Sequence, residues 1–436
     1  MNRPLSSALL ISNVVAATCL SAQSRPDTST QSYMVAGIQV IHRRAALNDI
    51  VAANVYLLGG SRQLTFANAG IEPLLLAVSE RGTAHYTREQ LRRQLARSGS
   101  TIVIDTDRDW SMLGLRTTRQ AFLETWTGFA DRIVAPRLDT ADVRIEREDA
   151  VSALAQRRDS PDDWTEHLAD SVAFAGHPYG IDPVGNDRSV AGLTAAALKS
   201  YHRDQFVKSR MLVVVVGDVE RPIVDSLVAA TLGALPAGTY RWTLPDTLPR
   251  RAATVYREQR ALPTNYLIGY APGPKAGDPD YDAMRVACAI LSGQLFAVVR
   301  SRQSLTYAVN APFEERAASA VGLYVTTNDP IAAVTAMRNE IRALQEEAID
   351  GRSLAPLIQQ FITEYFLDNE TMAAQANFLA RAQLYYGDWR RGNAFSASLR
   401  AVTPADIQRV MKRYFRDLNF AYVGDATKLP DSAIRF

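Results

Sequence analysis

The sequence contains little cysteine and little histidine, and this limits its chemistry. Only two cysteines and five histidines occur in 436 residues. Cys19 lies in an N-terminal stretch that resembles a removable leader, so the mature chain would keep only Cys288 and could form no internal disulfide. Cys288 stands among apolar residues and is predicted to be a small buried hydrophobe. No two histidines are four residues apart, which excludes a helix that presents such a histidine pair to a metal.

The chain also lacks an excess of charge of one sign. Its formal net charge is +2, and the basic residues are interspersed with acidic ones along the whole length. Proteins that bind nucleic acid usually have a clustered basic excess, so we expect no nucleic-acid partner. No glycine-rich loop follows a predicted strand, which leaves a nucleotide-binding role without support.

Long hydrophobic runs are missing beyond the N-terminus. Because no later segment approaches 18 uninterrupted apolar residues, no transmembrane segment is predicted in the mature chain. Residues 1–22 combine an early arginine, an apolar middle and small residues at the end, which is typical of a secretory signal peptide. We therefore expect export, into a bacterial periplasm, with a flexible polar leader up to Ser32. The alternative is a disordered native N-terminus.

Two segments of the chain repeat one layout. Residues 193–219 and 402–426 each contain a threonine suited to cap a helix, an amphipathic helix and an apolar strand that ends in Val-Gly-Asp. Each segment closes a half of similar length, which indicates duplication of a whole domain. Prolines cluster between the halves. We therefore predict homologous domains at residues 33–235 and 252–436, joined by a linker at 236–251.

Within each half, strands precede helices. This order predicts an α+β fold in which each domain has a mostly antiparallel sheet packed with helices. Strands are expected at residues 35–43, 53–60, near 102 and 112, and at 266–270, 305–311 and 321–326. Helices are expected at 87–98, 119–133, 140–157, 162–175, 331–349, 354–367 and 371–385.

Several motifs together resemble one family. They are GIEPLLLAVSERGT, DSPDDW and HPYGIDPVGNDRS in the first half, and LFAVVRSRQSLTY in the second. The chain is similar over nearly all of residues 35–426 to the pitrilysin/insulinase-like (M16-like) zinc peptidases. The resemblance implies the two-domain fold of that family, as in its two-chain branch.

The family's catalytic motif is absent. Its members bind zinc through His-x-x-Glu-His and a distant glutamate, and the motif's glutamate acts as the general base. The corresponding positions here are Pro73 and Ala77 for the histidines, Leu76 for the base, and Ser152 or Ala153 for the distant glutamate. None of these side chains can ligate zinc. The resemblance therefore implies that this chain binds no metal and has no activity alone.

Other polar residues do not rebuild the motif. Glu72 and Glu80 flank the vacated positions without ligand partners and are expected to be surface carboxylates. The apolar run between them, residues 74–78, is expected to be ordinary packing. Glu166 and His167 lie near His177 in sequence, but they lack the spacing of a zinc motif.

One functional element of the family is retained. Some members carry an arginine and a tyrosine seven residues apart that reach toward substrate bound at another domain's zinc. Arg300 and Tyr307 have this spacing, whereas Arg302 does not. The resemblance implies that the pair orients substrate, since both side chains can donate hydrogen bonds to a peptide carbonyl. The alternative is a cation at a helix end and an aromatic residue in a strand.

The resemblance implies a role for the whole chain. It would be the non-catalytic subunit of a heterodimeric peptidase, binding unfolded peptides for a partner subunit that carries the zinc. Peptide would bind partly through backbone hydrogen bonds at a sheet edge. The alternative function is that of a structural or scaffold subunit of a membrane-associated complex. A third reading, an active peptidase with displaced ligands, lacks the histidine pair it would need.

Overall fold

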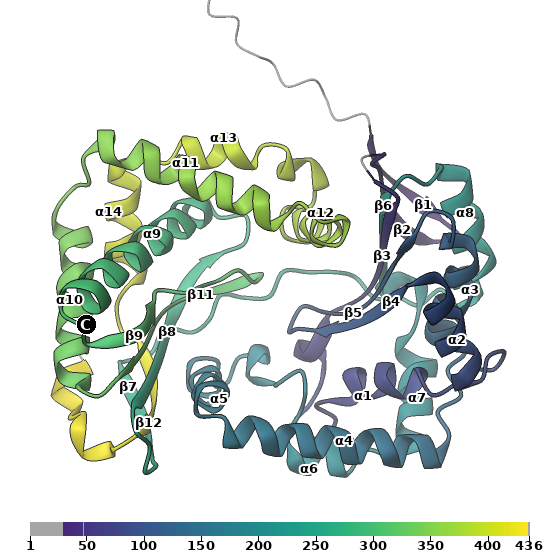
Figure 1. The fold of residues 1–436 in the computed structure, drawn as a ribbon, viewed down its shortest axis with the longest axis horizontal. Helices are drawn as coiled ribbons and strands as arrows, with labels where there is room; N and C mark the ends of the chain where they lie inside the picture. Colours follow the sequence, from purple (N-terminus) through teal and green to yellow (C-terminus); the bar gives the residue numbers. More distant parts are fainter. Residues whose placement is uncertain (1–28, 47, 435–436) are drawn as a thin grey trace, which may run out of the picture.

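The first half of the chain forms a six-stranded sheet covered by helices (Figure 1). The computed structural model describes residues 29–46 and 48–434. The predicted signal peptide at residues 1–22 lies outside the described residues. The strand order is β1-β2-β6-β3-β5-β4. The strands are β1 (Thr30–Val35), β2 (Ile38–Arg44), β3 (Ile50–Leu58), β4 (Thr101–Thr106), β5 (Trp110–Thr118) and β6 (Met211–Gly217).

The helices of this half follow the sheet in the sequence or connect its strands. They are α1 (Ile71–Ser79), α2 (Arg88–Ser98), α3 (Phe122–Val134), α4 (Thr140–Asp159), α5 (Pro161–Ala173), α6 (Asp187–Ala191), α7 (Ala195–Gln205) and α8 (Arg221–Ala230). Short 3-10 turns include η1 (Gly60–Gln63) and η2 (Pro178–Gly180).

The second half forms a second sheet with its own helices. The strand order is β10-β11-β8-β12-β7, and β9 also pairs with β11. The strands are β7 (Thr254–Gln259), β8 (Asn265–Lys275), β9 (Thr306–Asn310), β10 (Phe313–Glu314), β11 (Ala318–Thr327) and β12 (Asn419–Gly424). The helices are α9 (Asp280–Leu295), the π-helix η5 (Phe296–Arg302), α10 (Pro330–Glu346), α11 (Gly351–Asp368), α12 (Met372–Tyr386), the 3-10 turn η6 (Trp389–Gly392), α13 (Phe395–Arg400) and α14 (Pro404–Tyr414).

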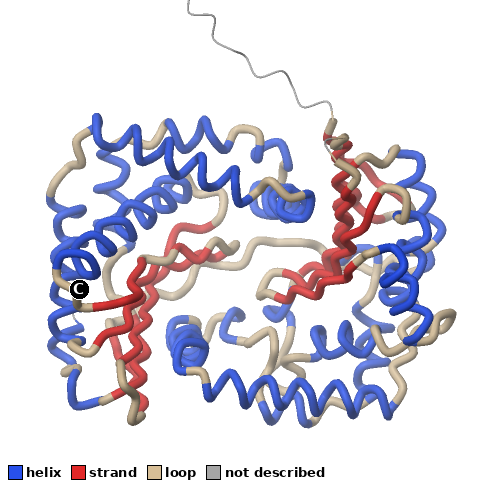
Figure 2. Tube along the Cα trace, viewed as in Figure 1, coloured by secondary structure: helices blue, strands red, loops and turns tan. Residues whose placement is uncertain are grey.

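The predicted α+β class is confirmed, with strands grouped in two sheets and helices around them (Figure 2). All strand pairs are antiparallel except β2 with β6 and β7 with β12. The two repeated segments form the same unit, α7 followed by β6 and α14 followed by β12. Thr194 and Thr403 cap these helices by accepting a hydrogen bond from the backbone three residues on.

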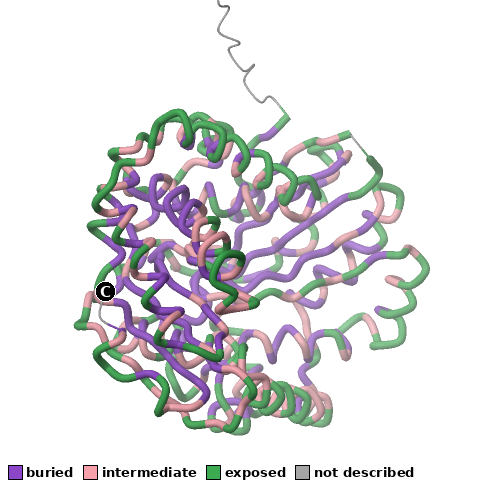
Figure 3. Tube along the Cα trace, turned by 60° about the vertical axis from the view of Figure 1, so that its left-hand side comes forward, coloured by how far each residue is buried: buried purple, intermediate pink, exposed green. Residues whose placement is uncertain are grey.

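The two halves each contribute a helix to the other's sheet. One face of the first sheet packs on its own helices, whereas the other face packs on α12 through a cluster that includes Tyr56, Trp110 and Leu379. In return, α5 packs on β8 and β12 of the second sheet. Residues 236–251 contain no helix or strand, but they are packed between the halves, and Trp242 Nε1 donates to the carbonyl of Leu384 at 2.8 Å. Buried segments run through the interior of the molecule, and exposed residues lie mostly around its outside (Figure 3).

The N-terminal hairpin differs from the prediction. The sequence predicted a flexible leader up to Ser32 and one strand over residues 35–43, but β1 and β2 form an antiparallel hairpin. Its turn has positive φ at Ala36 (49°) and Gly37 (87°), a conformation that matches the twist of the two strands. The leader prediction is wrong for residues 30–32, because the exposed Gln31 and Ser32 are polar and give this part of β1 no apolar pattern.

Helix α9 was not predicted from the sequence. Most of its side chains are buried, so it lacks the polar face that reveals an amphipathic helix. Cys288 is 2% exposed on this helix, and its predicted burial is confirmed. Among the described residues, the continuous helix Asp280–Arg302 is the one stretch long and apolar enough to cross a membrane. However, 56% of its most apolar window is buried within the protein, as expected for a core helix.

Candidate functional site

The vacated motif lies on α1, which begins directly after Gly70. Gly70 has φ 86°, a left-handed conformation that favours glycine, and an added Cβ would lie 2.7 Å from the carbonyl oxygen of Val184. Pro73 is the third residue of the helix, where a missing backbone N–H costs no intrahelical hydrogen bond. The chain can therefore keep this helix although proline replaces the first histidine of the family motif.

The structure brings three of the four vacated positions together. Pro73 and Ala77 on α1 and Ala153 on α4 line one cavity of about 430 Å³. The fourth, Leu76, does not line this cavity and is 3% exposed in the core. The predicted packing of the apolar run is confirmed for the buried residues Leu74, Leu75, Leu76 and Val78.

The cavity does not fit a metal. Apart from apolar residues and a glycine, its wall contains Glu146, Asp149 and Arg157. Glu146 accepts a hydrogen bond from Arg81 Nε at 2.5 Å, so its carboxylate is already paired. Within residues 29–46 and 48–434, no three histidine, cysteine, aspartate or glutamate side chains are grouped so that they could hold an ion. The position of the former ligands has become an apolar cavity.

Glu72 is buried, and the prediction that it is a surface carboxylate is wrong. It is 1% exposed and accepts hydrogen bonds from Ser111 Oγ at 2.5 Å, Tyr201 OH at 2.5 Å and Arg210 Nη2 at 3.0 Å. Burial, and then the nearby Glu72, raise the pKa of Tyr201 above its usual range. These contacts tie α1 to β5, to α7 and to the segment before β6. Glu80, in contrast, is exposed as predicted.

Arg300 and Tyr307 lie together on the second half. Arg300 belongs to the π-helix η5, and its guanidinium carbon lies 4.6 Å from the centre of the Tyr307 ring on β9. The same guanidinium carbon lies 4.7 Å from the centre of the Phe296 ring. Arg302 is exposed and lies near Glu340. Burial raises the pKa of Glu340, and the positive charge of Arg302 opposes this with a smaller, lowering effect. The sequence analysis did not single out Phe296, although this residue stands four positions before Arg300 on the same helical segment, a spacing at which side chains meet.

This aromatic–guanidinium stack, formed by Phe296, Arg300 and Tyr307, faces solvent. Tyr307 is 81% exposed and Phe296 is 47% exposed. Contacts between a guanidinium and ring faces restrain the cation, and the N–H groups along its edges stay available as donors. The stack can therefore present a guanidinium and a phenol to a carbonyl or carboxylate oxygen.

A free strand edge lies beside α1. Strand β4 pairs only with β5 in the described part of the chain, so one edge of β4 lacks a strand partner. Its residues alternate between exposed and half-buried, and Val103 is 43% exposed. An unpaired edge of this kind can accept an extended chain through backbone hydrogen bonds.

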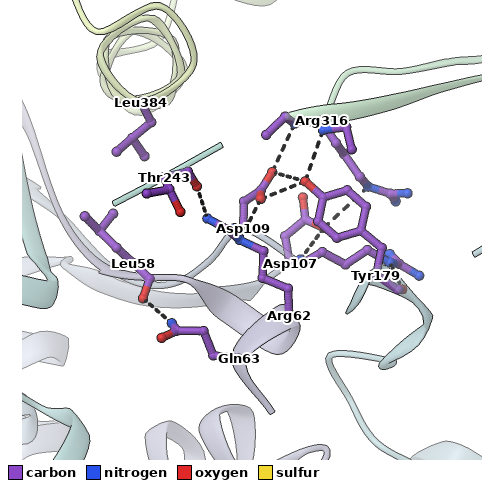
Figure 4. A network of polar contacts seen from close by, with 12 residues as sticks. Leu58, Arg62, Gln63, Asp107, Asp109, Tyr179, Thr243, Arg316 and Leu384 are labelled. Atoms are coloured by element: carbon purple, nitrogen blue, oxygen red, sulfur yellow. Dashed lines mark hydrogen bonds and ion pairs between the residues drawn. The ribbon is translucent and has the colours of Figure 1, made fainter. Parts of the chain in front are cut away.

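A buried polar junction holds the halves together (Figure 4). Asp109 is fully buried and accepts hydrogen bonds from Tyr179 OH at 2.7 Å, Tyr385 OH at 3.1 Å and the Ala317 backbone N–H at 3.1 Å. Arg62 Nε lies 3.3 Å from the same carboxylate. Burial raises the pKa of Asp109. Because Ala317 and Tyr385 belong to the second half, this carboxylate bonds the two halves to each other.

Comparisons with known proteins agree with this architecture. Residues 192–360 match the family model described as the peptidase M16 inactive domain. The chain is 25% identical to the mitochondrial-processing peptidase subunit beta of Blastocladiella emersonii, over 86% of this chain and 84% of that protein. It is 21% identical to the mitochondrial cytochrome b-c1 complex subunit 1 of Caenorhabditis elegans, over 87% and 85%. A crystal structure of a peptidase M16 inactive domain from Pseudomonas fluorescens superposes with a TM-score of 0.83 at 17% identity, covering 91% of this chain and 98% of that chain.

Proposed function

From the premise that this is an M16-like chain that carries the family's inactive domain, we propose that it is the non-catalytic subunit of a two-chain zinc peptidase. Its task would be to bind unfolded peptide and to orient the peptide for a partner subunit that carries the zinc. It would hydrolyse nothing alone.

One contrast carries the proposal. The metal-binding positions have been lost together, at Pro73, Ala77 and Ala153, whereas Arg300 and Tyr307 are held in contact and exposed. Exposed rings contribute little to a protein's own core, so the aromatic–guanidinium stack is better explained by contact with another molecule.

The described residues suggest how the chain would act on a peptide. The edge of β4 would hold an extended segment by backbone hydrogen bonds. The guanidinium of Arg300 and the phenol of Tyr307 would donate to a backbone carbonyl and favour negative charge on its oxygen. Zinc in the partner would activate the attacking water. Export of the chain stays a prediction, which N-terminal sequencing of the native protein near Gln23 would check.

A scaffold role is the second candidate, supported by the similarity to a cytochrome b-c1 complex subunit. In that role the chain would stabilise a membrane-associated assembly and would not contact peptide. The scaffold role gives no reason for the exposure of Tyr307.

We expect the purified chain to hold no stoichiometric zinc. The cavity at the former motif offers two acidic side chains and no histidine, and both of those acids are paired with Arg81. Metal analysis by plasma mass spectrometry after dialysis checks this. A triple variant with Pro73→His, Ala77→His and Ala153→Glu provides the matched control, because it restores donors at the same three positions. One tightly held zinc per wild-type chain would contradict the proposal.

Reconstitution tests the function itself. The chain is mixed with an insulinase-like subunit from the same organism that contains His-x-x-Glu-His, and cleavage of a fluorescence-quenched unstructured peptide is followed. We expect the two chains to co-elute and to cleave the peptide faster than the zinc-carrying subunit alone, while this chain alone is inactive. Co-elution without any gain in cleavage would favour the scaffold role.

A further inference from the structure

We propose that a cavity in the second half binds a carboxylate attached to an aromatic body. The cavity has a volume of about 290 Å³ and lies among α9, α11, α12, η6 and α13. Figure 1 shows α11, α12 and α13 gathered over α9, on the side of the second half away from β7 and β12. The cavity shares no lining residue with the aromatic–guanidinium stack or with the cavity on α1, so the inference does not depend on the proposed function.

Aromatic rings build one wall of this second-half cavity. Tyr365 on α11 stacks on Phe395 of α13 at 4.0 Å between ring centres, and the edge of Phe378 on α12 packs on Tyr365 at 5.6 Å. Tyr281 and Tyr386 also line the space and contact each other edge to face at 6.4 Å. Rings that support one another in this way form a rigid apolar surface on which a flat ligand can pack.

Two guanidinium groups line the cavity without a side-chain hydrogen bond. Arg381 has a side chain that is 45% exposed, and its guanidinium lies 3.8 Å from a carboxylate oxygen of Glu315, an ion pair beyond hydrogen-bond distance. Arg391 is exposed and contacts the ring face of Tyr386 at 5.3 Å, and over residues 29–46 and 48–434 it has no side-chain hydrogen bond or ion pair. In the same described residues, the hydroxyls of Tyr365 and Tyr386 have no hydrogen-bond partner either. Four donors from α11, α12 and η6 therefore line one space and stay available to a ligand.

A third arginine at the cavity, Arg285, does have hydrogen-bond acceptors within the protein. Arg285 is 8% exposed, and it donates to Glu315 Oε1 at 2.5 Å and to Asp282 Oδ1 at 3.1 Å. Those two carboxylates thereby each bind Arg285. Arg381 and Arg391 have no such hydrogen bond, so their donors are available to an acceptor that comes from outside the chain.

The charges at the cavity also limit the ligand. Asp368 lines the cavity as well, so the site contains a negative charge that repels a polyanion such as a nucleoside triphosphate. A single carboxylate can pair with Arg391 and Arg381 while its aromatic body packs on the rings. Such a group occurs in free aromatic carboxylic acids and at the C-terminus of a peptide that ends in an aromatic residue.

Calorimetric titration distinguishes these sources. The probes are N-acetyl-L-phenylalanine, its amide, and the tripeptide Ala-Ala-Phe with a free or an amidated C-terminus. We expect N-acetyl-L-phenylalanine to bind saturably and at least about tenfold more tightly than its amide, since the charged acceptor makes the stronger hydrogen bonds. Tighter binding of the tripeptide than of N-acetyl-L-phenylalanine assigns the site to peptide ends, and weaker binding assigns it to free acids.

Neighbouring arginines supply the matched variants. Arg391→Gln is expected to weaken binding of N-acetyl-L-phenylalanine about tenfold or more, whereas Arg390→Gln should have no effect, because Arg390 is mostly exposed, pairs with Asp388 and does not line the cavity. If Arg391→Gln lowers the melting temperature, Tyr386→Phe decides instead, since it removes one donor and keeps the ring. The proposal is overturned if no probe binds saturably at millimolar concentration, if the acid and its amide bind equally, or if folded Arg391→Gln and Tyr386→Phe both bind like the wild type.

Discussion

Replacing Arg300 with alanine is expected to slow peptide cleavage by the assembled complex about 10²–10³-fold while assembly stays intact. A positioned donor that stabilises a developing oxyanion typically contributes about 2.7–4 kcal/mol, which corresponds to this loss of rate. The loss should appear in kcat at least as much as in KM, since the donor matters most when charge forms on the carbonyl oxygen. Arg300 is partly exposed, so its removal should not disturb the fold.

Matched variants isolate the effect of this side chain. Tyr307→Phe keeps the ring on which the guanidinium packs and removes only the phenolic donor, so it should slow cleavage less than Arg300→Ala does. Arg302→Ala removes a neighbouring exposed cation; among the described residues Arg300, not Arg302, packs on the two rings, so the effect should be small. Complex formation is measured by size-exclusion chromatography beside each rate. Unchanged cleavage by a fully assembled Arg300→Ala complex would show that the aromatic–guanidinium stack does not act on substrate.

Replacing Asp109 with alanine is expected to destabilise the protein by about 3–5 kcal/mol, the range found when one partner of a buried charged network is removed. The change leaves two phenols, a backbone N–H and the Arg62 guanidinium without their shared acceptor at the junction. Urea titration followed by circular dichroism measures this as a lower midpoint. Asp109→Asn keeps one acceptor oxygen and should therefore lower the stability less than Asp109→Ala does.

An exposed aspartate controls for the loss of charge alone. Asp49 has a side chain that is 77% exposed and pairs at 3.6 Å with the exposed Arg119, so Asp49→Ala should change the stability by less than about 1 kcal/mol. If Asp109→Ala were no more destabilising than Asp49→Ala, the junction would not hold the halves together.

The sequence predicted those features that depend on local pattern. Amphipathic helices such as α3 and α10, and the two helix–strand units capped by Thr194 and Thr403, follow from side-chain periodicity and capping residues. Family spacing placed Arg300 and Tyr307 as a pair, and the structure has them in contact.

Features that depend on distant partners could not be predicted. Glu72 looks like a surface residue because its partners Ser111, Tyr201 and Arg210 lie far along the chain, and only the fold brings them to it. The same holds for Asp109, which receives donors from both halves. A buried charge has no local signature, since its burial is acceptable only when remote donors satisfy it.

The position of the final strand in each sheet has a consequence for how the chain folds. β6 lies between β2 and β3, and β12 lies between β8 and β7, so in each sheet the strand made last occupies the interior. Neither sheet can be completed from its early strands alone, and β12 follows its neighbour β8 only after α9 to α14. Contacts of such long sequence separation are slow to form, because the loop between the partners must be ordered first. On the ribosome, the second sheet would stay incomplete until β12 has been made, with β7 and β8 lacking the strand that lies between them throughout that time.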